Sequence, residues 1–118
     1  MNIDKLYDFV REFYGYKIEM LFINETENSI GGILYDSFLV KCFLSNDDKI
    51  FSAGICYGNS EQMITELFGK KCLTICDEKL LQDSLRIIDN YCRLRLPDKF
   101  LDAHYKAYVL SQYEDCDM

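Results

Sequence analysis

The chain has 118 residues, of which 49% are hydrophobic and 28% charged, with six glycines and one proline. This length and balance indicate one globular domain, residues 1–118, and exclude a disordered or low-complexity chain. The formal net charge of −7 argues against nucleic acid as a partner, because the phosphate backbone repels an acidic surface.

The first half of the chain predicts one helix followed by antiparallel strands. Residues 4–14 repeat apolar side chains every three or four positions, which is typical of an amphipathic helix. Strands are expected over residues 17–23, over 33–44 with a bend near Asp36 and Ser37, and over 49–57. The pair Gly31 and Gly32 predicts a bulge or turn where the second of these strands starts.

The second half predicts helices. A short helix is expected from Ser60 to Phe68, and residues 71–76 fit either a strand or an extended connector. Asp77 begins a longer helix that Pro97 ends, a last helix covers 98–112, and residues 113–118 form a polar tail expected to fray. The predicted fold is therefore α+β: an antiparallel sheet of three to four strands after an N-terminal helix, covered by C-terminal helices in a two-layer arrangement.

Catalytic and metal-binding patterns are weak in this sequence. His104 is the one histidine, and Asp102, two residues away on a helix, points to another side. Cys72 and Cys76 lack the spacing of a zinc finger, although with His104 and a further cysteine they contain the donors of a zinc site. We therefore predict no enzyme activity, no cofactor and no metal centre, and do not expect a small-molecule ligand.

Six cysteines are spread along the chain, and five of them lie in apolar segments. No run of residues approaches the ~20 apolar positions of a membrane span, so we expect no membrane partner. The N-terminus has neither the basic start nor the continuous apolar run of a signal peptide. The sequence thus predicts a cytoplasmic protein whose cysteines are reduced and mostly buried.

Acidic residues gather in the connections between predicted elements and at the C-terminus. A surface of this charge attracts a basic protein, or serves only to keep the chain in solution. Tyrosines near element ends, such as Tyr108, are also typical of interfaces. The residues predicted to bind a partner are Glu25, Glu27, Asp47, Asp48, Tyr113, Glu114, Asp115 and Asp117. A helical edge around Arg86, Arg93 and Arg95 is the alternative surface.

In its general character the chain resembles bacterial immunity proteins, in particular those of contact-dependent growth inhibition systems. Small size, acidic charge and the segments Asn24–Asn28, Asn46–Asp48 and Tyr113–Asp117 carry the resemblance. It implies a cytoplasmic protein that binds and neutralises one cognate toxin domain, often a nuclease with a basic substrate groove. The alternative function is that of a small adaptor or regulatory subunit in a larger protein assembly.

Overall fold

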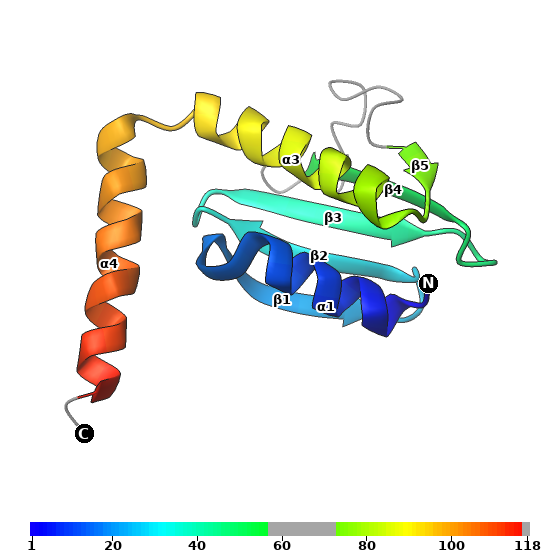
Figure 1. The fold of residues 1–118 in the computed structure, drawn as a ribbon, viewed down its shortest axis with the longest axis horizontal. Coiled ribbons are helices and arrows are strands. Elements are labelled where there is room, and N and C mark those ends of the chain that lie inside the picture. The colour runs from blue at the N-terminus through cyan, green and yellow to red at the C-terminus, as the bar shows by residue number, and fades with distance from the viewer. Residues whose placement is uncertain (57–72, 117–118) are drawn as a thin grey trace.

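The computed structural model describes residues 1–56 and 73–116, which form an α+β fold as predicted (Figure 1). Helix α1 precedes a sheet, and helices α3 and α4 follow it. The elements are α1 (Ile3–Tyr14), a 3-10 turn (Gly15–Lys17), β1 (Ile18–Asn24), β2 (Ser29–Leu34), β3 (Phe38–Leu44), β4 (Ile50–Cys56), β5 (Leu73–Ile75), α3 (Glu78–Leu94) and α4 (Asp98–Cys116). The helix predicted at residues 60–68 lies outside the described residues.

The strands form an antiparallel meander, paired in chain order from β1 to β5. Four strands form the body of the sheet. For residues 71–76 the sequence left a strand or a connector open, and the described residues Leu73–Ile75 form the short strand β5. The bend predicted near Asp36 and Ser37 is a full reversal of the chain, so residues 33–44 form the end of β2, a turn and β3 instead of one bent strand. Tyr35 and Asp36 have φ angles of 53° and 55° there, in a tight turn whose left-handed backbone is uncommon for a tyrosine.

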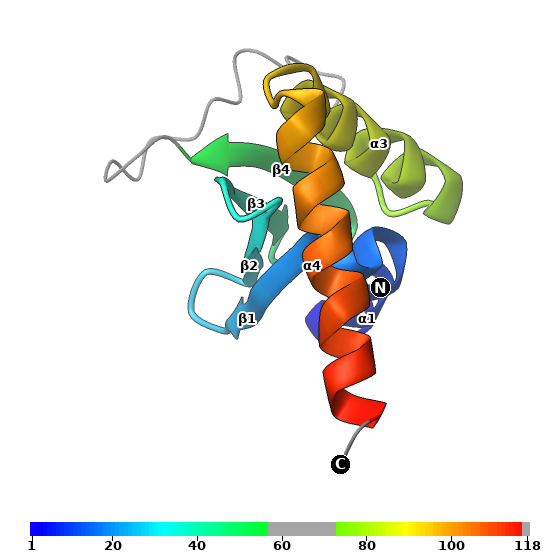
Figure 2. The ribbon, with the colours of Figure 1, turned by 90° about the vertical axis from the view of Figure 1, so that its left-hand side faces the viewer.

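Helices α1 and α3 cover one face of the sheet and create the core (Figures 1 and 2). Leu6 and Val10 of α1 and Leu81, Leu85 and Ile88 of α3 are buried against the strands. From the sheet, alternate residues point into the same core: Ile30, Leu34, Val40, Cys42, Phe51, Ala53 and Ile55. The Tyr14 hydroxyl donates a hydrogen bond of 2.8 Å to the Leu85 carbonyl and so joins the two helices.

The glycine pair lies inside β2, and the expected irregularity occurs in β1 instead. The register between β1 and β2 shifts between Glu19 and Phe22, where Met20 has a φ of 56°. After this bulge the Phe22 ring lies over Gly31 so closely that a Cβ there would be 2.5 Å from it. The glycine therefore leaves room for the close approach of this ring and does not form a turn.

Helix α4 packs across one end of these two layers and extends beyond them (Figure 2). Its first half touches the body through aromatic contacts: Tyr108 stacks on Tyr16 with ring centroids 4.9 Å apart, and Tyr105 meets the same ring edge-on at 5.6 Å. Its backbone stays helical through Cys116, so the tail expected to fray from residue 113 continues the helix. None of the described helices is both long and apolar enough to cross a bilayer.

Candidate functional site

Four of the predicted partner-binding residues lie at one end of the sheet. Glu25 and Glu27 belong to the turn between β1 and β2, and Asp47 and Asp48 to the turn between β3 and β4. Because neighbouring strands of an antiparallel meander reverse direction, these two turns meet at the same end. We call Glu25, Glu27, Asp47 and Asp48 the acidic edge.

Asn28 fastens the two turns of the acidic edge to each other. Its backbone has a φ of 53°, a left-handed conformation that asparagine tolerates. Its side-chain Nδ2 lies 3.4 Å from the Leu44 carbonyl, 3.2 Å from the Ser45 carbonyl and 2.9 Å from Asp48 Oδ1. The carboxylates of the acidic edge are therefore presented from two turns that hold a fixed position relative to each other.

Asp47 is exposed, yet its carboxylate is engaged within its own turn. Its Oδ1 accepts a hydrogen bond of 2.6 Å from the Ser45 hydroxyl and one of 3.2 Å from the Lys49 backbone N–H. The bond from Ser45, and then the bond from Lys49, lower the pKa of Asp47 below its ordinary value, because both favour the charged form. This position of the acidic edge thus keeps its negative charge near neutral pH.

The two glutamates of the acidic edge differ in how far they are engaged. Glu27 accepts a 3.1 Å hydrogen bond from the Ser29 hydroxyl and lies 3.9 Å from the Lys41 ammonium. Glu25 is exposed, and its carboxylate makes no hydrogen bond or ion pair within the described residues. Glu25 is therefore the position at which charge can be altered without disturbing a turn.

The remaining predicted residues do not join the acidic edge. The backbone of Tyr113, Glu114 and Asp115 lies near the C-terminal end of α4, at the end of the molecule away from those turns (Figure 1). Asp117 lies outside the described residues. The set predicted from sequence is thus divided between two ends of the protein.

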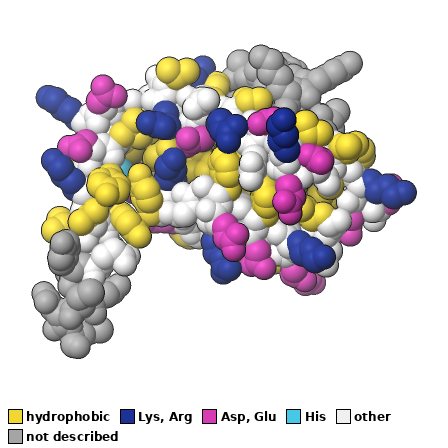
Figure 3. Space-filling view, viewed as in Figure 1, with side chains coloured by type: hydrophobic (Ala, Val, Ile, Leu, Met, Phe, Trp, Pro, Cys, Tyr) yellow, Lys and Arg dark blue, Asp and Glu magenta, His cyan; other side chains and the backbone are white. Residues whose placement is uncertain are grey.

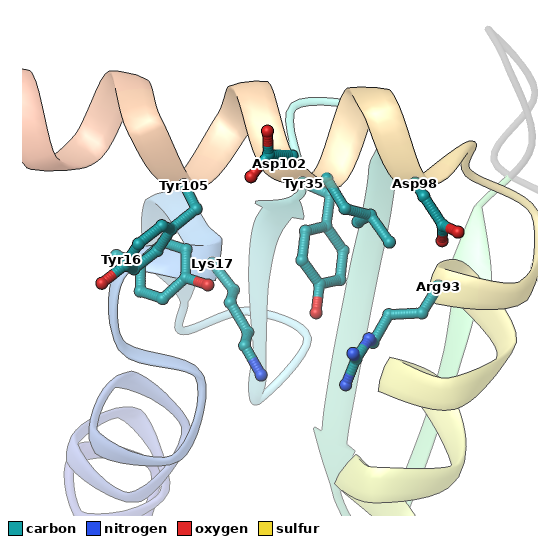
Figure 4. Close-up of a pocket in the computed structure, with 8 residues that line it drawn as sticks. Tyr16, Lys17, Tyr35, Arg93, Asp98, Asp102 and Tyr105 are labelled. Carbon is teal, nitrogen blue, oxygen red and sulfur yellow. The ribbon is translucent and has the colours of Figure 1, made fainter.

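A pocket of about 400 Å³ opens at the other end of the sheet, beneath α4 (Figure 4). Tyr35 lies at its centre, with Lys17 on one side and Arg93 on the other. Its walls come from the 3-10 turn, the turn between β2 and β3, the end of α3 and the start of α4: Tyr16, Lys17, Tyr35, Arg93, Asp98, Leu101, Asp102 and Tyr105. Of these residues, Arg93 alone belongs to a surface predicted from the sequence, the alternative helical edge.

Below this pocket, Asp89 of α3 is the centre of a buried polar network. The Tyr35 hydroxyl donates a 2.6 Å hydrogen bond to Asp89 Oδ1, while Lys17 Nζ and Arg93 lie 3.7 Å and 4.0 Å from Oδ2. Burial, and then the bond to Asp89, raise the pKa of Tyr35 well above its usual range. Tyr35 therefore stays protonated, and its main role here is to fasten the strained β2–β3 turn to α3.

His104 of α4 lies among aromatic rings where this helix contacts the rest of the protein. Phe100 stacks on it with centroids 6.3 Å apart, and Tyr16 and Tyr35 approach to 5.8 Å and 5.7 Å. Its side chain is only 7% exposed, and its nearest carboxylate is that of Asp36, with Nε2 and Oδ2 3.7 Å apart. As expected, Asp102 points elsewhere, since it pairs with Lys106 at 2.9 Å.

The positions of Cys76 and His104 decide whether they can share the zinc site considered from the sequence. Cys76 follows β5 and donates its backbone N–H to the Lys49 carbonyl, near the acidic edge, whereas His104 lies at the opposite end beside Asp36. A zinc site that uses both residues is therefore excluded by their positions. Cys72 lies outside the described residues. Cys42 and Cys92 are buried, and burial raises the pKa of Cys92 to about 12.

Searched against protein-family models, curated proteins and solved structures, the chain matches none of them. We therefore infer function from the geometry of these two ends. Sequence reasoning found the acidic edge because turn residues are recognisable one by one. It missed Tyr35, Asp89 and Asp36, because their contacts join segments that are far apart in the chain and no short motif connects them.

Proposed function

We propose that this chain is a protein-binding domain that holds a basic partner against its acidic edge, and that it acts as an immunity protein that neutralises a cognate toxin domain in the bacterial cytoplasm. One observation carries the proposal: four carboxylates from two separate turns lie at one end of the sheet and are held there by Asn28. The proposal assigns no catalytic residue and no cofactor.

The electrostatics of the acidic edge favour fast association with a basic surface. Its four carboxylates outnumber Lys41, which pairs with Glu27, and Lys49, which follows Asp48, and the chain as a whole has a formal net charge of −7. Acidic and basic side chains are interspersed on the face seen in Figure 3, so the attraction is local to an edge and not spread over that face. Such exposed charges act on the association rate more than on the lifetime of a complex.

The structure selects Glu25→Lys as the test, because this side chain has no partner in the described residues whose loss would disturb the fold. Its matched control is Glu12→Lys, an exposed glutamate of α1 with the same change of charge. The ligand is the toxin domain that the proposal expects a neighbouring gene to encode, and association is followed by stopped-flow fluorescence. Glu25→Lys should slow association severalfold, whereas Glu12→Lys should slow it much less.

Salt gives an independent measurement of the same mechanism. Raising the ionic strength to about 0.15 M shortens the screening length to about 8 Å and should remove most of the difference between the two variants. Co-expression of the chain should also protect cells from the toxin domain. Failure to bind that domain, or equal association rates for both variants at low salt, would contradict the proposal.

The adaptor function is a second candidate, and α4 is the observation that favours it. Hydrophobic side chains gather on this helix (Figure 3), and Tyr105 and Leu110 are 50% and 62% exposed. Apolar surface on a projecting helix is typical of protein–protein contacts. Under this alternative, Leu110→Ser would weaken binding to the partner assembly and Glu25→Lys would not; under the immunity proposal the order is reversed.

A further inference from the structure

Three side chains with metal-binding donors meet where α4 packs on the sheet. Glu19 comes from β1, Asp36 from the turn between β2 and β3, and His104 from α4. One donor atom of each lies within 4.8 Å of the others. The same residues line a pocket of about 170 Å³ together with Tyr16, Ala107, Tyr108 and Ser111. They lie at the end opposite the acidic edge, so a ligand bound here is independent of the proposed function.

The His104 imidazole has no satisfactory partner within the described part of the chain. Its Nδ1 is buried without a hydrogen bond, and the 3.7 Å between its Nε2 and Asp36 Oδ2 is too long for one. A buried polar group normally finds a partner, so an imidazole with neither nitrogen hydrogen-bonded calls for an explanation. An ion on Nε2, the nitrogen that faces Asp36, would supply one, while Nδ1 would still lack a partner. Since the side chain is only 7% exposed, bulk solvent does not supply that partner.

We propose that Glu19, Asp36 and His104 bind a divalent transition-metal ion, with Zn²⁺ as the ion that best fits these donors, and that the ion fastens α4 to the sheet. Imidazole nitrogen together with carboxylate oxygens suits zinc and its neighbours in the first transition row. Calcium and magnesium prefer oxygen donors alone. Three protein ligands leave a fourth position for water or for a group from a partner.

The distances need only a small adjustment to close around an ion. Tetrahedral zinc with bonds of ~2.0–2.1 Å places neighbouring donor atoms ~3.4 Å apart. His104 and Asp36 are already at 3.7 Å, and exposed Glu19 moves most easily of the three. The aromatic rings of Phe100, Tyr16 and Tyr35 hold the imidazole, and the β2–β3 turn holds Asp36. The imidazole is thus preorganised, whereas for Asp36 the turn fixes the backbone and the exposed carboxylate can still adjust.

The site lacks one feature of tight metal centres. A metal-bound histidine usually donates its second ring N–H to a carboxylate or carbonyl, and loss of such a partner weakens metal binding by ~10–100-fold. Nδ1 of His104 has no such partner among the described residues. We therefore expect reversible binding of moderate affinity.

The single histidine makes the test specific, because every imidazole NMR signal belongs to His104. Zn²⁺ alone is titrated into the reduced full chain while calorimetry and ¹⁵N NMR of the imidazole are recorded. Stoichiometric binding with a large shift of the Nε2 resonance is expected. Co²⁺ is then used as a spectroscopic probe, since bound thiolates give an intense charge-transfer absorption that this imidazole–carboxylate site lacks.

Variants separate the proposed site from other donors. Glu19→Gln and Asp36→Asn keep the size of the side chain and should each weaken Zn²⁺ binding at least ~10-fold, as should His104→Ala. Glu12→Gln and Asp102→Asn are the matched controls on the exposed surface and should leave it unchanged. Thermal unfolding in the absence of metal verifies that each variant is folded.

Backbone amide exchange gives a second measurement, of whether the ion stabilises the packing of α4 on the sheet. Zn²⁺ should slow backbone amide exchange in residues 98–108 of the original chain and not in Glu19→Gln. The proposal is overturned if Zn²⁺ leaves the His104 signals unchanged, if Co²⁺ gives thiolate absorption instead, or if folded Glu19→Gln and Asp36→Asn both bind as tightly as the original chain. None of these three results requires His104→Ala, so the proposal can be overturned even where that variant fails to fold.

Discussion

The two ends of the sheet differ in how their polar side chains are placed. At one end the carboxylates of the acidic edge lie in hairpin turns, whereas at the other end Asp89 of α3 and His104 of α4 are buried where α4 packs. The acidic edge uses its carboxylates locally, to accept hydrogen bonds from its own turns. The α4 end uses Asp89 of α3 to join Tyr35 and Lys17, which are distant in sequence, and Arg93 of the same helix. Substitutions at the first end should therefore alter charge with little effect on the fold, whereas substitutions at the second should alter stability.

The largest effect is expected from Asp89→Ala. This change leaves the buried Tyr35 hydroxyl without its acceptor and removes the partner of Lys17, so we expect a loss of about 3 kcal/mol in the free energy of unfolding. The matched control on the same helix is Asp83→Ala, whose exposed pair with Arg86 contributes under ~0.5 kcal/mol. Urea unfolding measures both variants. Equal losses would show that the Asp89 network contributes no more to the free energy of unfolding than an exposed ion pair does.

A smaller loss is expected from Tyr35→Phe, which removes only the hydroxyl. A buried hydrogen bond to a charged group contributes about 2 kcal/mol. The pKa of Tyr35 is raised in the folded chain, so above pH ~10 the unfolded chain releases this proton while the folded chain keeps it. Stability therefore falls as the pH rises through that range.

The phenylalanine variant tests this alkaline loss directly. Urea unfolding of both proteins between about pH 8 and pH 11 should show a shallower decline for Tyr35→Phe, since one proton difference is removed. The raised pKa of Cys92, about 12, contributes to the decline in both proteins and cancels in the comparison. Parallel pH profiles would mean that the pKa of Tyr35 is not raised in the folded chain.

At the acidic edge the largest effect should come from Asn28. Asn28→Ala loses the bonds to Leu44, Ser45 and Asp48 and places a β-carbon at a φ of 53°, which together should cost about 1.5 kcal/mol. Asn28→Gly removes the same bonds but accepts that backbone conformation, so its loss should be smaller. The ratio of the two losses, from thermal unfolding, separates the side-chain bonds from the backbone strain.

The sequence was sufficient for the elements whose signals are local. The period of apolar residues predicted α1, Asn2 and Asp77 cap their helices by side-chain bonds to backbone N–H groups, and Gly15 ends α1 with a φ of 57°. The α+β fold followed from the order of these elements. The same local rules left residues 45–48 as the connection between two predicted strands, where the structure has a turn.

What could not be predicted depends on contacts between distant segments. The sequence predicts a bend near Asp36 and Ser37 but not a full reversal, because Tyr35 and Asp36 are not the Asn-Gly or Gly residues that indicate tight turns. This turn is held by the Tyr35–Asp89 bond. The residues meeting His104, Glu19 and Asp36, belong to a bulged strand and to that same turn. Their meeting depends on where α4 packs, and no periodicity in the sequence fixes that position.

The smallest effect is expected at Asp47, and it sharpens the contrast between the two ends. Its pKa is lowered by the hydrogen bonds from Ser45 and Lys49, so the folded chain releases the proton at a pH where the unfolded chain still binds it. The resulting stabilisation is present above the ordinary aspartate pKa and is lost as the pH falls through the lowered value.

Titration of the Asp47 carboxyl carbon by NMR should give a midpoint below the ordinary range for aspartate, with the Lys49 amide shifting at the same pH. Ser45→Ala is the informative variant, because it removes the first of the two bonds while leaving the carboxylate in place. It should move the midpoint back toward the ordinary value without unfolding the chain, since the bond is exposed. A midpoint unaffected by Ser45→Ala would mean that the hydroxyl does not hold this carboxylate. The lowered pKa of Asp47 would then owe nothing to Ser45.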